Sequence, residues 1–153
     1  MSVDQKASAD ILQIVANLPD FLRKPIIVKK LDEFFSLDDP GKNETISMIL
    51  RGSSSIESKK LSPLIKAWLQ ILTELESNKI TELFRIYCEV LIVNPTFFEK
   101  LNIQPLVDAY LKLEDKNKKR LSDCFKEVIF LFPNRTEFFK GIPQSIFEQL
   151  KLL

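Results

Sequence analysis

The chain repeats itself with a period of 38 residues, which limits it to a small set of architectures. The segments 19–42 and 95–118 align without a gap at twice this spacing. Their alignment contains eight identities, where about two are expected for unrelated segments of this composition. The identical pairs are Pro19/Pro95, Phe21/Phe97, Lys24/Lys100, Ile27/Ile103, Asp32/Asp108, Leu37/Leu113, Asp39/Asp115 and Lys42/Lys118. Apolar residues follow the same period in the series Leu31, Leu69, Val107, the series Ile14, Val90, Val128, and the series Val15, Leu91, Ile129.

Prolines and apolar spacing predict that each repeat consists of helices. A short first helix is expected at 19–24, 95–100 and 134–140. A second helix should follow a second proline, at 26–37, 64–76, 106–114 and 144–152. A third should cover 43–51, 79–93 and 117–132, and residues 4–17 match the end of such a helix. We therefore expect roughly ten helices in one domain, with repeats at about 1–18 (partial), 19–56, 57–94, 95–132 and 133–153 (partial).

The predicted helix 79–93 is apolar around most of its circumference. Its polar residues Glu82, Arg85 and Glu89 form one narrow stripe, and the helix 117–132 has the same pattern, with Leu131 expected inside. A helix that is apolar on nearly all sides has to lie between neighbouring helices.

The run from Gly52 to Lys60 differs from the other repeats because it is rich in serine and lysine. This composition favours a mobile loop where the other repeats have a short first helix.

A short helix followed by two longer ones, repeated every 38 residues, resembles the armadillo and HEAT-type helical repeats. The resemblance lies in the pattern of helices and prolines and extends over nearly the whole chain. It implies an all-α superhelix that acts by binding a partner on a repeat surface. Compact helical adaptor domains of the VHS and ENTH kind have a similar size and remain an alternative.

Composition excludes several kinds of chemistry. The chain has no histidine, which excludes Ser-His-Asp and Cys-His catalysis and histidine-ligated zinc. Its three glycines are too few for a glycine-rich phosphate loop. The formal net charge of +1 gives no overall attraction to nucleic acid or to an anionic membrane. We expect a protein that is not an enzyme and that has no cofactor and no metal site.

The cellular compartment is predicted from three features. Cys88 and Cys124 are too few for a disulfide scaffold, and two buried thiols are typical of a reducing compartment. The first ten residues are polar and do not resemble a signal peptide. The longest apolar run, 128–132, is far too short to span a membrane. We expect an intracellular location, either cytoplasmic or nuclear.

Stacking of the third helices would bring residues 38 apart side by side. Three such ladders carry polar or charged side chains: Glu44, Glu82 and Arg120; Ser47, Arg85 and Asp123; and Arg51, Glu89 and Glu127. In armadillo-like proteins the third helices line the concave face, so the resemblance implies that these nine residues line a groove of mixed charge for a protein partner. The alternative is a solvated helix face with ordinary i,i+4 pairing.

Two other surfaces carry alternative hypotheses. The corner 116–126 is basic, which is compatible with a nucleic-acid-binding helical repeat. The last residues include Ile146, Phe147, Leu150 and Leu153, with no third helix to follow them. Such apolar surface at the end of a helical stack predicts either self-association, which would make the protein a homo-oligomer, or docking of a partner. The favoured function is an intracellular protein–protein interaction scaffold or adaptor, and the alternatives are nucleic-acid binding and a VHS/ENTH-like trafficking adaptor.

Overall fold

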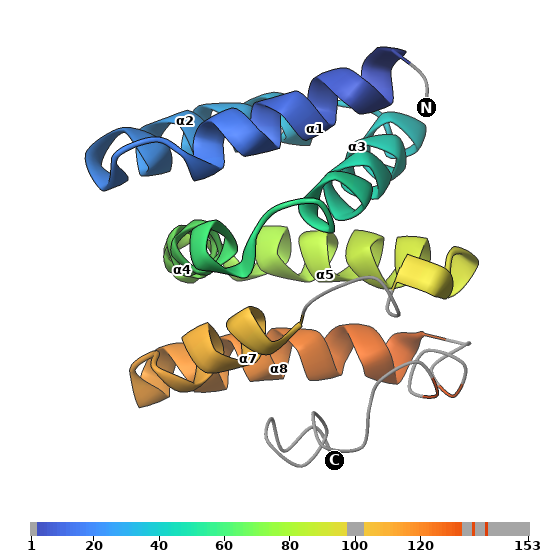
Figure 1. The fold of residues 1–153 in the computed structure, drawn as a ribbon. Helices are drawn as coiled ribbons and strands as arrows, with labels where there is room; N and C mark the ends of the chain where they lie inside the picture. The colour runs from blue at the N-terminus through green and yellow to red at the C-terminus, as the bar shows by residue number, and fades with distance from the viewer. Residues whose placement is uncertain (1–2, 98–102, 133–135, 137–139, 141–153) are drawn as a thin grey trace.

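The computed structural model describes residues 3–97, 103–132, 136 and 140. The exposure of side chains is described from residue 10 onward. Within these residues the chain is all-α: it forms seven helices and no strand (Figure 1). The helices are α1 (Val3–Ala16), α2 (Asp20–Phe35), α3 (Asp39–Ser53), α4 (Ser58–Glu74), α5 (Ser77–Val93), α7 (Gln104–Leu111) and α8 (Asp115–Leu131). Seven is fewer than the roughly ten expected. The expected helix 144–152 and most of 134–140 lie outside the described residues.

The helices form two contacting rows. In one row α1 contacts α3, α3 contacts α5 and α5 contacts α8, and in the other α2 contacts α4 and α4 contacts α7. Figure 1 shows α1 with α2, α4 with α5 and α7 with α8 following one another through the molecule, with α3 crossing between the first two pairs. The row α1–α3–α5–α8 consists of the helices that the repeat assigns to the third position. Side chains on neighbouring members of this row can therefore line a common surface.

The prediction of separate first and second helices at 19–24 and 26–37 is wrong. Residues Asp20–Phe35 form one helix with Pro25 inside it, and Pro63 lies inside α4 in the same way. Each proline is the sixth residue of its helix and leaves one carbonyl without its usual i+4 donor. These carbonyls belong to Phe21 and Lys59, which are exposed, so water can replace the missing donor. Pro105, in contrast, lies in the first turn of α7, where a proline is well tolerated.

The serine-rich segment is also more ordered than the loop predicted for 52–60. Helix α3 continues to Ser53 and α4 begins at Ser58, so only four residues are outside a helix. The hydroxyls of Ser53, Ser54 and Ser55 donate hydrogen bonds to carbonyls three residues earlier. These bonds satisfy carbonyls at the helix end that have no intrahelical partner. Ile56 is buried in a small cluster with residues of α1 and α4, which anchors the turn.

Helix α5 lies at the centre of the main core. Ile80, Leu83 and Ile86 are at most 1% exposed, because α3 packs on one side of α5 and α8 on the other. The prediction that this helix is enclosed by neighbours is therefore confirmed. The periodic series Leu31, Leu69, Val107 and the series Val15, Leu91, Ile129 are buried throughout. In the described residues, no helix has both the length and the apolar character needed to cross a bilayer.

Candidate functional site

An open groove of about 500 Å³ runs between α5 and α8. One wall comes from α5 and the other from the end of α8. The residues that line the groove are Asn78, Thr81, Glu82, Arg85 and Glu89 on α5, and Glu127, Val128, Leu131 and Phe132 at α8. The volume lies within the range of small-ligand clefts, but the cleft is open to solvent and four of its nine lining residues are charged. The groove is therefore better suited to a segment of chain than to an enclosed small molecule.

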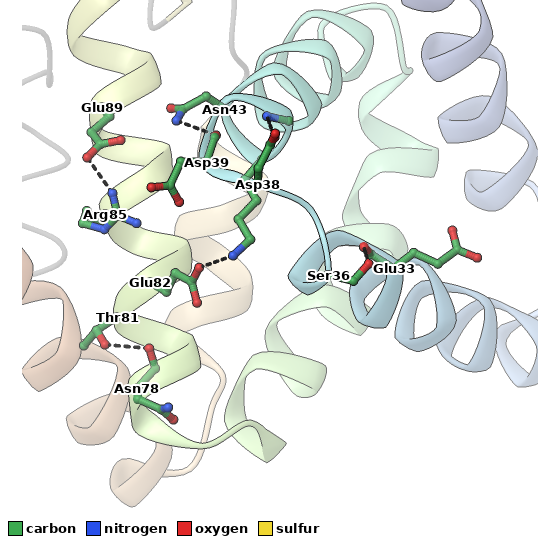
Figure 2. Close-up of polar contacts among 12 residues, drawn as sticks. Glu33, Ser36, Asp38, Asp39, Asn43, Asn78, Thr81, Glu82, Arg85 and Glu89 are labelled. Carbon is green, nitrogen blue, oxygen red and sulfur yellow. Dashed lines mark hydrogen bonds and ion pairs between the residues drawn. The ribbon is translucent and has the colours of Figure 1, made fainter.

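The α5 wall is a stripe of polar side chains one or two turns apart. Figure 2 shows Asn78, Thr81, Arg85 and Glu89 following one another along the helix. The guanidinium of Arg85 donates to Glu89 at 2.8 Å, an i,i+4 pair. The carboxylate of Glu82 accepts from the Lys42 ammonium of α3 at 2.6 Å, which ties α5 to the preceding helix of its row. Both pairs hold the α5 wall in a defined arrangement.

The α8 wall combines charge with apolar surface. Val128 is buried, whereas Leu131 is 73% exposed and Glu127 is exposed. The expectation that Leu131 lies inside is therefore wrong, because among the described residues no helix covers this side of α8 at its end. Residues 127 and 131 are four apart, so the carboxylate and the leucine lie on the same face of α8. This face brings an acidic group and an apolar group together along one wall.

Four of the nine residues in the predicted ladders line this groove: Glu82, Arg85, Glu89 and Glu127. Glu89 on α5 and Glu127 on α8, which are one period apart in the sequence, both line the groove. The other five lie elsewhere. Glu44 is exposed and Ser47 half-buried on α3, and the Arg51 guanidinium lies 5.6 Å from the centre of the Phe97 ring. Asp123 pairs with Lys119 at 2.7 Å, and Arg120 contacts the end of α4.

Arg120 has a structural role that its position in a ladder did not indicate. Its guanidinium donates to the carbonyl of Thr73 at 2.6 Å and also to the carbonyl of Leu75. These are carbonyls at the end of α4, where the helix dipole is negative and intrahelical donors are missing. Arg23 does the same for α1, donating to the carbonyls of Val15, Ala16 and Leu18. Arg120 therefore fixes α8 against α4.

The basic corner 116–126 is largely neutralised within the chain. Lys118 pairs with Asp115 at 3.3 Å and Lys119 with Asp123 at 2.7 Å, while Arg120 is bonded to α4. Among the described residues of this corner, Lys116 and Lys126 have no ion-pair partner. Two free ammonium groups would neutralise few phosphates, which weakens the nucleic-acid hypothesis.

The two cysteines are buried thiols, as predicted. Cys88 and Cys124 are free, and burial raises the pKa of Cys88 from 9.0 to about 12. Burial is also the main reason that the pKa of Cys124 is raised. Thiols in this state react slowly and bind metals poorly. In the part of the chain that the structure describes, no group of three or more Cys, Asp or Glu side chains is arranged to hold a metal ion.

Sequence reasoning missed two parts of the site. Lys42 is only 9% exposed, and its pairing with Glu82 could have been suspected only from the stacking of α3 on α5. Leu131 is expected inside from the sequence, although its spacing of four residues from Glu127 puts these two residues on the same face of the helix. The predicted self-association residues Ile146, Phe147, Leu150 and Leu153 lie outside the described residues.

Comparison with protein-family models, curated proteins and solved structures found no match for this chain.

Proposed function

We propose that this protein is an interaction scaffold with an armadillo/HEAT-like superhelical arrangement, and that the groove between α5 and α8 receives a segment of a partner protein. The two rows of helices and the burial of residues one period apart support the repeat arrangement. The two buried thiols favour an intracellular location. The proposed activity is binding, with no chemical step.

One observation carries the proposal: an apolar side chain is exposed inside a groove with charged walls. Leu131 is 73% exposed and lines the groove beside Glu127. An exposed leucine on its own is ordinary, but one within a groove of about 500 Å³ can be covered by a bound side chain. Binding would remove its apolar surface from water, and the charged groups around it would orient the partner.

The proposal can be tested without knowledge of the natural partner. Random dodecapeptides displayed on phage are selected on the wild-type chain and then measured against Leu131→Gln. The matched control is Ile14→Gln, because Ile14 is 61% exposed on α1, which does not line the groove. Both variants should keep the wild-type circular dichroism spectrum, since neither side chain is buried.

We expect the selected peptides to bind Leu131→Gln at least about tenfold more weakly than wild type, the effect of losing one buried leucine contact. Their affinity for Ile14→Gln should be unchanged. Peptides that bind both variants as tightly as wild type, or a selection that enriches no peptide, would show that the groove is not a binding site.

A further inference from the structure

We infer that the groove selects a partner segment with a lysine or arginine two residues away from a large apolar residue. This inference rests on the proposed function, because it names the chemistry of the segment that the groove would bind. It follows from the charges on the walls and from the distance between two side chains of α8.

The groove has an excess of negative charge after its own ion pairs are formed. Glu82 is paired with Lys42 at 2.6 Å, and Glu89 with Arg85 at 2.8 Å. Glu127 lines the same groove and is exposed, and among the described residues it takes part in no ion pair. One carboxylate therefore remains without a cation. A cationic side chain of the partner would supply it, whereas an acidic segment would be repelled.

The Glu89 carboxylate on the facing wall strengthens this preference. It is about one-third exposed, and its bond to Arg85 uses one of its two oxygens. A cation that enters the groove therefore meets a carboxylate on each of its two walls. A guanidinium or ammonium group is attracted by both and has several donors to offer them.

The position of the apolar contact follows from the geometry of α8. Glu127 and Leu131 are four residues apart, which separates their Cβ atoms by about 5–6 Å along the groove. In an extended peptide, side chains two residues apart point the same way and are separated by ~6.6 Å. A cation opposite Glu127 and an apolar side chain opposite Leu131 therefore fit an extended segment at spacing i,i+2.

The test uses the phage selection on the intact chain and reads the composition of the groove-dependent peptides, defined as those that bind Leu131→Gln more weakly. We expect lysine or arginine to be enriched two positions from a large apolar residue. A synthetic peptide from this set should bind Glu127→Gln about two- to fivefold more weakly than wild type. The matched control Glu44→Gln changes an exposed glutamate on α3, which does not line the groove, and should bind like wild type.

A charge swap makes the assignment specific. Replacing the peptide cation with glutamate should weaken binding to wild type, and Glu127→Lys should restore part of that loss. Binding to wild type should also fall as NaCl rises from about 0.05 M to about 0.5 M, because the contact is exposed to solvent.

The outcomes separate this inference from the function on which it rests. Groove-dependent peptides without basic residues, or with acidic ones, would overturn the inference and leave the groove as a binding site. Equal effects of Glu127→Gln and Glu44→Gln would also overturn it. If no peptide depends on Leu131, both the inference and the proposed function fail.

Discussion

Residues at the same position of the repeat are exposed at the α1–α2 end of the molecule and buried in the centre around α5. Val90 on α5 and Val128 on α8 are 4% and 8% exposed, whereas Ile14, at the same repeat position on α1, is 61% exposed. Phe97 is 9% exposed, and its equivalent Phe21 on α2 is 77% exposed. The residue types are alike, so the difference comes from their neighbours. Phe97 is covered by the Arg51 side chain of α3, and among the described residues no helix covers Phe21.

This difference shows that a periodic sequence fixes which residues can be buried, and the neighbouring helix decides which of them are. Interior helices gain cover on two sides, as α5 does from α3 and α8. A stable, well-covered helix is a good wall for a binding groove, because its side chains lose little freedom when a partner binds. The groove lies against α5 and not at the α1–α2 end.

Substitution of the equivalent phenylalanines should give the largest contrast. Phe97→Ala removes a buried ring and should lower the free energy of unfolding by about 3–5 kcal/mol. Phe21→Ala removes an exposed ring and should change it by less than about 0.5 kcal/mol. Urea denaturation followed by circular dichroism measures both. Equal losses for the two variants would mean that Phe21 is covered as Phe97 is.

Arg120 tests how firmly the centre is held together. Arg120→Met keeps most of the side-chain stem but removes the hydrogen bonds to the carbonyls of Thr73 and Leu75. We expect a loss of about 1–2 kcal/mol in the free energy of unfolding. Lys119→Met, which breaks only a solvent-exposed pair with Asp123, is the control and should cost less than about 0.5 kcal/mol. Similar losses for both variants would contradict the role assigned to Arg120.

The buried thiol of Cys88 offers a smaller effect that depends on pH. Its pKa is raised from 9.0 to about 12 by burial, so the folded state keeps the proton that the unfolded state loses above pH 9. Stability should therefore be full below pH 9 and fall as pH rises toward 12, by about 1 kcal/mol between pH 9 and pH 10 from this group. Cys88→Ala should flatten this part of the curve. An unchanged slope in the variant would show that Cys88 does not contribute to it.

Much of the fold could be predicted from periodicity, because apolar spacing reports which face of a helix is covered. The predicted helices 79–93 and 117–132 agree with Ser77–Val93 and Asp115–Leu131 within two residues at each end. Pro25 and Pro63 were misleading because a proline in the second turn is tolerated when the freed carbonyl is exposed, and exposure depends on tertiary structure.

Only part of the candidate site could be predicted from the sequence. The ladders place Glu89 and Glu127 in one series because the two residues are one period apart, and both line the groove. They could not reveal that Arg120 turns away to the end of α4, since that contact joins two different rows of helices. Nor could they reveal that Leu131 is exposed, because an apolar residue at a core spacing is buried only if a neighbour reaches it.

Native-state hydrogen exchange tests most directly whether α5 is the best-protected helix and the α1–α2 end the least covered. Amides of α5 around Ile86 should exchange only through global unfolding, so their protection should equal the free energy of unfolding measured in urea. Amides of α1 around Ile14 should exchange at least about tenfold faster, through local opening of a helix with an exposed apolar face. Equal protection in α1 and α5, or faster exchange in α5, would contradict the assignment of α5 as the covered centre on which the groove is built.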